Sequence, residues 1–262
     1  MTRSFFVQII VTVFVAVVVS FAYANDDANT VLRVVAYNVH HCEGTDGKLD
    51  VERTASVMKR LNPDLIAVQE IDVNTRRTDK QNQAELLAKS LGMKFAFGKA
   101  IDYQGGEYGI LILSKFPIVE QKMVLLPPKA QQEQRGVLVA NIKLSDSKTI
   151  RFACTHLSVA SAEERQVQVE KINELLLDEK IPTIIAGDFN ARPRSDAMKT
   201  ILKSWTDSDD PTFKKHTMPA HPNKIDYILF NPKSAFEVRE SQTIDDPITS
   251  DHDPILSVLI ML

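Results

Sequence analysis

Short apolar runs alternate with amphipathic stretches over most of this chain. The runs have the length and composition of buried strands, and turn residues separate them. They predict strands at 31–38, 65–69, 95–99, 108–114, 118–126, 137–144, 149–156, 182–186, 225–230, 236–240 and 255–260. Because these strands are too apolar for either inner face to meet water, we expect two sheets packed face to face.

Three stretches place apolar residues at helical spacing. Asp50 is a suitable N-cap for a helix that runs to about Leu61, a second helix at 81–91 ends at Gly92, and a third covers 162–177. We expect these helices to lie outside the sheets. The pattern predicts an α/β fold with one domain over residues 25–262.

The first two dozen residues have the pattern of a signal peptide. Arg3 precedes an apolar run at 5–19, and Ala22-Tyr23-Ala24 offers the small residues that a signal peptidase accepts. We expect cleavage after residue 24 and export to the periplasm or the medium. An uncleaved membrane anchor is the alternative, because the run approaches the roughly 20 residues that a spanning helix needs.

Charge and cysteine content narrow the possible partners. The formal net charge is −3, and the longest basic runs are the pairs Arg76-Arg77 and Lys214-Lys215, which we interpret as solvated surface. This argues against a stable nucleic-acid complex, although a metal can offset phosphate charge locally in a nuclease. Cys42 and Cys154 lack zinc-site spacing, and the sequence leaves open whether they form a disulfide.

Polar side chains that bind metals or transfer protons lie at the ends of several expected strands. A single acid after a strand is commonly a turn residue or a helix cap, but a whole set of such ends is not explained in that way. The set is Asn38, Glu70, His156, Asp188, Asn190, Asp226, Asp251 and His252. Carboxylate and amide oxygens for a hard cation, a base for water and histidines for developing charge are what phosphoester cleavage requires.

Six short motifs occur in a characteristic order along nearly all of the chain from about residue 32 to 259. They are Val35-Ala36-Tyr37-Asn38, Gln69-Glu70, Thr155-His156-Leu157, Gly187-Asp188-Phe189-Asn190, Ile225-Asp226-Tyr227 and Ser250-Asp251-His252-Asp253-Pro254. Each motif alone is weak, but the ordered set resembles the endonuclease/exonuclease/phosphatase superfamily, which has a DNase I-like fold.

The resemblance implies a four-layered αββα sandwich of two mixed, mainly antiparallel sheets flanked by helices. It also implies cleavage of phosphoesters by in-line attack of an activated water, with Mg²⁺ or sometimes Mn²⁺. Glu70 would be the main metal carboxylate, with Asn38 and Asp251 completing the shell directly or through water.

The same resemblance assigns the remaining groups to catalysis. Asp188 would orient or deprotonate the attacking water, and Asn190 would hold the phosphate or a metal-bound oxygen. His156 and His252 would donate to the phosphoryl oxygens, with Asp226 fixing the tautomer or charge of His252. A protonated histidine held by an acid suits this role, because negative charge grows on those oxygens during attack.

Two further places are open to more than one interpretation. Tyr108 and Arg135 resemble substrate-binding residues of the family, and pairing of Arg135 with a buried acid is an equally good alternative. His40-His41 follows the first strand and would either line the pocket mouth or, slightly favoured, belong to a polar loop.

Substrate choice rests on what the sequence lacks. It has neither a basic stripe nor interleaved aromatics for a polymer, its single Trp205 is expected in a helix, and the segment 212–222 is too short for a large insertion. We therefore expect an exported, monomeric phosphodiesterase or phosphatase that acts on a small substrate or a lipid head group. A secreted nuclease is the alternative, and a non-catalytic binding protein of the same fold is less favoured because the catalytic residues are retained.

Overall fold

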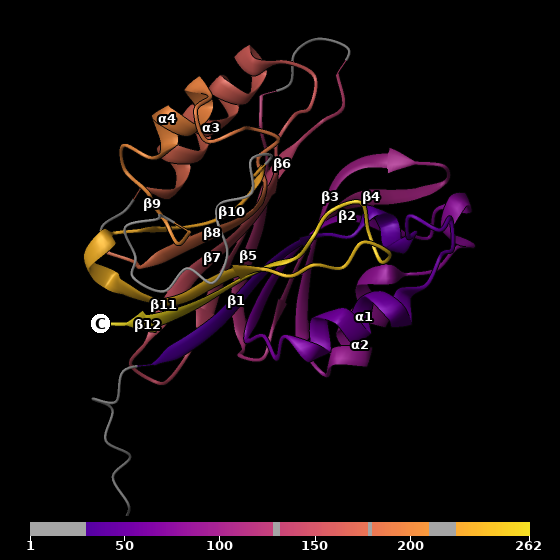
Figure 1. Cartoon of the computed structure of the whole chain (residues 1–262), viewed down its shortest axis with the longest axis horizontal. Helices are drawn as coiled ribbons and strands as arrows, with labels where there is room; N and C mark the ends of the chain where they lie inside the picture. Colours follow the sequence, from indigo (N-terminus) through magenta and orange to yellow (C-terminus); the bar gives the residue numbers. More distant parts are fainter. Residues whose placement is uncertain (1–29, 128–131, 178–179, 210–223) are drawn as a thin grey trace, which may run out of the picture.

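The expected strands pair into two six-stranded sheets. The computed structural model describes residues 30–127, 132–177, 180–209 and 224–262 (Figure 1). One sheet has the order β11 (Phe236–Thr243), β12 (Ile255–Met261), β1 (Val31–Asn38), β2 (Leu65–Val73), β4 (Gly106–Ser114), β3 (Lys94–Tyr103). The other has the order β5 (Ile118–Leu125), β6 (Gly136–Lys143), β7 (Thr149–His156), β8 (Thr183–Asp188), β10 (Asp226–Asn231), β9 (Thr206–Asp207).

Both sheets are mixed, with one parallel pair each. In the first sheet β1 and β2 run parallel and α1 (Val51–Arg60) connects them. In the second, β7 and β8 run parallel and α3 (Ala162–Leu176) connects them. All other neighbours in the described sheets are antiparallel. The expectation of two mixed, mainly antiparallel sheets flanked by helices is confirmed.

Helices cover the outer face of each sheet (Figure 1). α1 and α2 (Gln83–Leu91) pack on the first sheet, whereas α3 and α4 (Asp196–Ile201) pack on the second. Asp50 caps α1 by accepting a hydrogen bond from the Arg53 backbone N–H, as expected. Gly92 ends α2 in the left-handed conformation, with φ of 66°.

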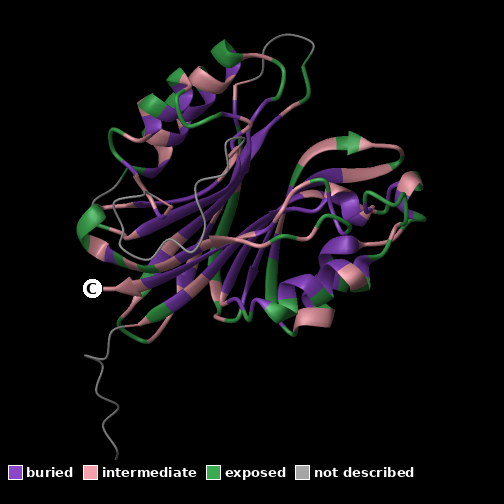
Figure 2. Ribbon diagram, in the orientation of Figure 1, coloured by how far each residue is buried: buried purple, intermediate pink, exposed green. Residues whose placement is uncertain are grey.

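Alternate residues of the strands fill three apolar layers. On β1, Val34 and Ala36 face the opposite sheet, while Val35 and Tyr37 face the helices. On β8, Ile184 faces the other sheet in the same way. Figure 2 shows this burial along the central strands. A sheet that is buried on both faces leaves only its strand ends free to present polar side chains to solvent.

Several expectations are corrected or lie outside the described ranges. Trp205 is not helical: it follows α4, is buried, and donates its indole N–H to Asn173 Oδ1 at 2.8 Å. Cys42 and Cys154 are free, buried thiols. The expected signal peptide and Lys214-Lys215 lie outside the described residues. Within the described ranges, no helix has the length and apolarity needed to cross a bilayer.

Candidate active site

Strand register places the polar strand ends of each sheet side by side. His156 at the end of β7 pairs with Asp188 at the end of β8, and Asp188 pairs with Asp226 at the start of β10. In the other sheet, Asn38 at the end of β1 pairs with Gln69, next to Glu70. The two groups meet, because Asn38 Nδ2 donates to Glu70 Oε1 at 3.0 Å and to Asp188 Oδ2 at 3.3 Å.

Glu70 owes its direction to a bulge in β2. The β2–β4 register shifts between Val68 and Ile71, and Glu70 has a φ of 62°, in the left-handed region. A bulge turns a side chain out of the regular alternation of a strand, and non-glycine residues hold such a conformation only where the surroundings impose it. The bulge thus points the Glu70 carboxylate toward Asn38.

Asn38 presents its amide nitrogen to the two carboxylates. Its Oδ1 accepts the backbone N–H of His40 at 3.1 Å, so the hydrogen-bond network assigns the oxygen to the loop and the nitrogen to Glu70 and Asp188. This places Asn38 as a residue that orients Glu70. The sequence predicts that Asn38 binds the metal either directly or through water. Direct binding through its oxygen requires the amide group to flip, whereas binding through a water molecule does not.

Asp188 is the point on which the site converges. Its Oδ1 accepts the backbone N–H of Asn190 at 2.7 Å, and the Asn190 amide donates to Leu157 O at 3.0 Å and to Asp188 Oδ2 at 3.4 Å. Asp188 Oδ2 also lies 3.5 Å from His156 Nε2 and 3.8 Å from His252 Nε2. Burial raises the pKa of Asp188, the Asp226 charge adds to this, and His252 opposes it.

His156 is neutral and its tautomer is fixed. The Arg135 guanidinium donates from Nη1 to His156 Nδ1 at 3.1 Å, and a guanidinium has no acceptor, so Nδ1 carries no proton. Burial lowers the pKa of His156 well below its ordinary value, and Arg135 and His252 add to this. The single ring proton is therefore on Nε2, facing Asp188.

His252 has the opposite character. Its Nδ1 lies 2.9 Å from Asp226 Oδ2. Burial alone would lower the pKa of His252, but the hydrogen bond to Asp226 and the charges of Asp226 and Asp188 raise it to about 9. His252 is thus an imidazolium at neutral pH, and it donates through Nδ1 while Nε2 faces Asp188. One neutral and one charged imidazole flank the same carboxylate oxygen.

Ser250 ties the last motif to the end of β1. Its hydroxyl donates to the Asn38 carbonyl at 2.8 Å, and its Oγ accepts the His252 backbone N–H at 3.2 Å. Asp251 between them is exposed, and it accepts a longer hydrogen bond from Ser250 at 3.4 Å. Of the expected metal ligands, Asn38 and Glu70 are in direct contact, whereas Asp251 is exposed and contacts Ser250.

Comparison with known proteins shows which family the chain belongs to. The model of the endonuclease/exonuclease/phosphatase family matches residues 35–252. The chain belongs to this family. Its members hydrolyse phosphoester bonds, and the residue set described above lies within the matched range.

Individual relatives are distant. The uncharacterized protein YbhP of Escherichia coli K12 is 27% identical over 173 residues, 60% of this chain and 66% of that protein, so the chain spans slightly under two thirds of this relative. An endonuclease/exonuclease/phosphatase structure from Beutenbergia cavernae has a TM-score of 0.72 at 21% identity, covering 88% and 72% of the two chains. The Bacteroides thetaiotaomicron mannosyl-6-phosphatase has a TM-score of 0.68 at 18% identity, covering 88% and 100%. Both share the fold.

The two expected substrate-binding residues are buried next to the same cluster. Arg135 is buried, contacts His156 and pairs with Glu133 at 2.9 Å. Glu133 is an exposed acid, so the alternative of pairing with a buried acid is wrong, and substrate binding by Arg135 stays a prediction. Tyr108 is also buried. Burial raises the pKa of its hydroxyl, Glu70 adds to this, and Arg135 lowers it, which places the phenol between the two.

Arg77 has a role that the sequence pattern does not indicate. The expectation of a solvated surface is wrong for this residue, which makes a two-pronged ion pair with fully buried Asp72, at 2.6 and 2.9 Å. Its guanidinium lies over the rings of Tyr103 and Tyr108, and Arg77 thereby supports the position of Tyr108. The available signal was Asp72 itself, because an acid within an apolar strand requires a cationic partner.

A cavity of about 330 Å³ opens beside the charged histidine. It extends from His252 between β10 and β11, where Ser241 and Thr243 add hydroxyls. Its charged lining residues are Lys224, Asp209, Asp226, Asp251, Asp253 and His252. Acidic groups outnumber basic ones, so the cavity suits a neutral or cationic group better than a second phosphate.

The donor set of the cluster fits a divalent cation. Glu70 is a carboxylate oriented by the Asn38 amide, and Asp251 offers a second, exposed carboxylate in the lining of the cavity beside His252. Mg²⁺ takes oxygen ligands and is satisfied by one or two carboxylates plus waters. The second carboxylate–histidine group, Asp188, Asp226 and His252, is instead held together by the Asp226–His252 hydrogen bond.

Proposed function

We propose that this protein is an exported, metal-dependent phosphoesterase that hydrolyses a small phosphodiester or phosphomonoester. The observation that carries the proposal is the convergence of Asn38, Asn190, His156 and His252 on the single carboxylate of Asp188. A site of this kind has a base, oriented amides and a cationic group within a few ångströms, which water attack on phosphorus requires.

Asp188 acts as the base in this proposal. Its Oδ1 is held by the Asn190 backbone N–H, so the carboxylate has one fixed orientation. Because burial raises its pKa above that of an ordinary carboxyl group, Asp188 accepts a proton from water more readily. Asn38 and Asn190 prevent its rotation and leave Oδ2 at the centre of the site.

His252 and His156 have separate roles. His252, charged at neutral pH through Asp226, stabilises the negative charge that develops on the phosphoryl oxygens. His156 is neutral and presents an N–H from Nε2, with Arg135 fixing that tautomer. A divalent cation bound through Glu70 and Asp251, when present, supplies the remaining charge neutralisation.

The cavity beside His252 supports a small substrate. A volume of about 330 Å³ is at the lower end of ligand pockets, and its excess of acidic groups disfavours a polyanion. A protein of the same fold is named a mannosyl-6-phosphatase, which supports a phosphatase among the candidate activities. We therefore place a phosphomonoester or phosphodiester with a small polar alcohol portion ahead of nucleic acid.

Hydrolysis of model esters tests the proposal. Purified protein lacking residues 1–24 should hydrolyse p-nitrophenyl phosphate or bis(p-nitrophenyl) phosphate with Mg²⁺ or Mn²⁺, and the Asp188→Asn variant is the matched control. Absence of turnover with either metal, together with absence of metal binding, would defeat it.

Two discriminating measurements refine the proposal. Plasmid nicking that is lost in both Asp188→Asn and His252→Ala would favour a secreted nuclease over a small-substrate enzyme. N-terminal sequencing of protein recovered from the periplasm or medium should begin at residue 25, whereas an N-terminus at residue 1 in the membrane fraction would indicate an uncleaved anchor.

A further inference from the structure

The segment directly after β1 holds two histidines in a strained backbone. His40, His41 and Cys42 have φ values of 44°, 44° and 60°, and together they form the short helix η1 (His40–Cys42). Gln83 Nε2 donates to the His41 carbonyl at 2.6 Å, and the Asp50 N–H donates to the Cys42 carbonyl at 2.8 Å, which holds this conformation. Left-handed non-glycine residues are concentrated at functional sites.

Glu43 occupies one ring nitrogen of each histidine. His40 Nδ1 lies 3.2 Å from the Glu43 carbonyl oxygen, which can only accept, so this nitrogen carries the proton and Nε2 keeps its lone pair. His41 Nε2 lies 3.4 Å from Glu43 Oε2. Histidines that bind metals in proteins are held by their other nitrogen on a carbonyl or carboxylate in this way.

The second nitrogen of His41 has no partner among the described residues. His41 is 6% exposed, and Nδ1 is buried without a hydrogen bond. A polar loop, the favoured interpretation from sequence, does not explain why this ring is buried with a bare nitrogen, because buried polar atoms are almost always paired. A ligand for that nitrogen does explain it.

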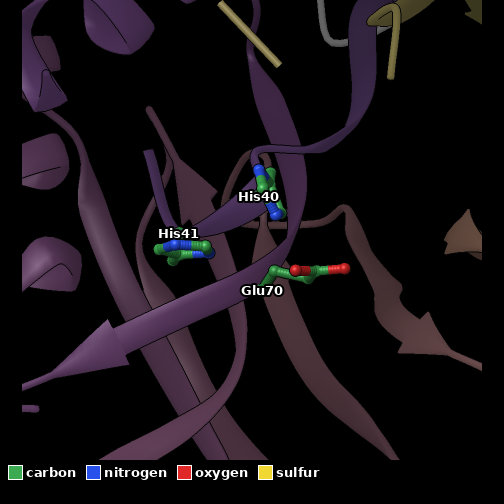
Figure 3. A group of neighbouring side chains, drawn as sticks. All are labelled: His40, His41 and Glu70. Carbon is green, nitrogen blue, oxygen red and sulfur yellow. The ribbon is translucent and has the colours of Figure 1, made fainter. Parts of the chain in front are cut away.

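Glu70 completes a three-residue group with these rings. One ligand atom from each of His40, His41 and Glu70 lies within 4.8 Å of the other two. Figure 3 shows the two imidazoles next to each other and beside Glu70, whose carboxylate extends away from His41. The ring centroids are 4.4 Å apart. Ligand atoms at these separations lie within reach of one bound ion.

We propose that His40, His41 and Glu70 form a transition-metal site, in which two imidazole nitrogens and one carboxylate bind Zn²⁺ or a similar divalent ion. Imidazole ligands suit Zn²⁺ and its transition-metal neighbours, whereas Mg²⁺ prefers oxygens. Two histidines and one glutamate are also a sufficient protein shell for Zn²⁺ with an open position for water. The site shares Glu70 with the proposed hydrolytic centre but does not depend on the proposed reaction.

Metal binding by the chelator-stripped protein tests this site without any hydrolysis assay. Co²⁺ is added first, its visible absorption is recorded, and Zn²⁺ is then added as competitor. We expect Co²⁺ bands that Zn²⁺ displaces at stoichiometric concentration and that excess Mg²⁺ does not. The variants are His40→Gln and His41→Gln, and His252→Gln is the matched control, since it removes the histidine of the other candidate group.

The expected results distinguish the two groups. His40→Gln and His41→Gln should weaken Zn²⁺ binding by more than the roughly 10- to 100-fold that loss of an outer partner causes, and Glu43→Gln should fall within that range. His252→Gln should keep wild-type Zn²⁺ affinity. Wild-type affinity in both His40→Gln and His41→Gln, or loss in His252→Gln alone, would overturn the proposal.

Separate controls distinguish a loss of folding and a failure of the proposed function from loss of this metal site. His40 is only partly buried, so His40→Gln tests the site even if His41→Gln fails to fold, and circular dichroism of the metal-free variants checks this. A protein that binds Zn²⁺ through these histidines but cleaves no phosphoester refutes the proposed function and leaves this site intact. If the protein hydrolyses phosphoesters but does not bind Zn²⁺ in preference to Mg²⁺, the proposed function stands and the transition-metal site is refuted.

Discussion

Two histidines on either side of one carboxylate oxygen carry different charges because their surroundings differ. Burial, with the Arg135 guanidinium that donates to the ring, lowers the pKa of His156 and keeps it neutral, whereas Asp226 accepts from His252 and keeps it charged. The same side-chain type thus supplies a neutral N–H and a cation within one site.

Removing the charge of Asp226 should therefore change the pH range of activity. The pKa of His252, raised to about 9 in the folded protein, should fall toward its ordinary 6.5 in Asp226→Asn. The charge on His252 contributes stability that is fully present below the pKa of His252 in the unfolded chain and is lost as pH rises through its pKa in the folded protein. The same charge is proposed to stabilise the phosphoryl oxygens during attack. Activity of the variant should therefore decline from near neutral pH upward, well before that of the wild type.

The pH dependence of kcat/KM and an NMR titration of the His252 ring check this expectation. The His156 ring is the internal control, because burial and Arg135 keep it neutral in both proteins. An unchanged alkaline limb in Asp226→Asn would contradict the role assigned to this pair.

Asp188→Asn should lower turnover by about 10²- to 10⁴-fold, the usual scale for loss of a proton-transfer group. Glu70 and Asn38 keep their hydrogen bond in this variant, so metal affinity should remain close to that of the wild type. Steady-state kinetics at saturating metal and calorimetric Mg²⁺ titration measure the two quantities. Full activity would show that another group deprotonates the water.

The identity of these residues could be predicted from the sequence, but their orientation could not. The order of polar strand ends along the chain was sufficient to find Asp188, His252 and Glu70. The direction of the Asn38 amide and the left-handed φ of Glu70 depend on groups that arrive from the other sheet and from a bulge. Such features follow from tertiary contacts, which a local pattern does not contain.

At the scale of elements, both sheets use the same arrangement. Each has a parallel pair joined by a helix, with β1 and β2 in one and β7 and β8 in the other. The site residues occupy equivalent ends of these strands, with Asn38 corresponding to His156 and Glu70 lying near the position of Asp188. The active site is therefore the meeting of two similar halves: Asn38, His156 and Asp188 come from the carboxyl ends of strands, and Glu70 comes from the bulge within β2.

Close approach of β7 and β8 depends on Gly187. A Cβ atom at this position would overlap the Thr155 carbonyl oxygen, and φ is 149°. Gly187→Ala should lower the free energy of unfolding by about 2–3 kcal/mol or more, because strands must separate in a packed sheet. Since His156 and Asp188 follow these residues directly, activity should fall with stability.

Urea denaturation measures this effect, and Gly92→Ala is the matched control. Gly92 also has a positive φ, of 66°, but no atom lies within 4 Å of the place that a Cβ would take, so only the backbone cost of about 1 kcal/mol applies. Equal losses in the two variants would show that contact with Thr155 does not matter.

Most elements could be read from the apolar pattern, with ends within a few residues, because buried strands and capped helices have strong local signals. β1 and β7 begin and end where the pattern predicts. The pattern does not predict α4, because six residues are too few to show helical periodicity. The expected helix at Trp205 is wrong because α4 ends at Ile201. The strand order was not readable, since it depends on pairing between distant segments.

At the scale of the whole molecule, the cation should stabilise the fold. Its proposed ligands Glu70 and Asp251 are 181 residues apart in the sequence, and an ion that binds both stabilises only the folded state. Mg²⁺ at about 100 times its Kd should raise the free energy of unfolding by about 2.7 kcal/mol. Thermal melts with and without EDTA measure this shift.

Glu70→Ala is the variant that tests this linkage. Loss of the main expected ligand should abolish most of the Mg²⁺-dependent rise in Tm and raise the metal concentration required for hydrolysis. Asp50→Ala, which removes only the N-cap of α1 at a cost of about 1 kcal/mol, should keep the rise. A rise of wild-type size in Glu70→Ala would place the ion elsewhere.

The strands that complete the first sheet, β11 and β12, are the last to be synthesised. β1 is flanked by β2 on one side and by β12 on the other, so residues near 31–36 wait for partners at 255–260. During translation, at roughly 5–20 residues per second, an edge of β1 stays unpaired for about ten seconds or more after it is synthesised. A chaperone that shields this apolar strand on the nascent polypeptide, or passage through a translocon before folding, would prevent aggregation of the nascent chain.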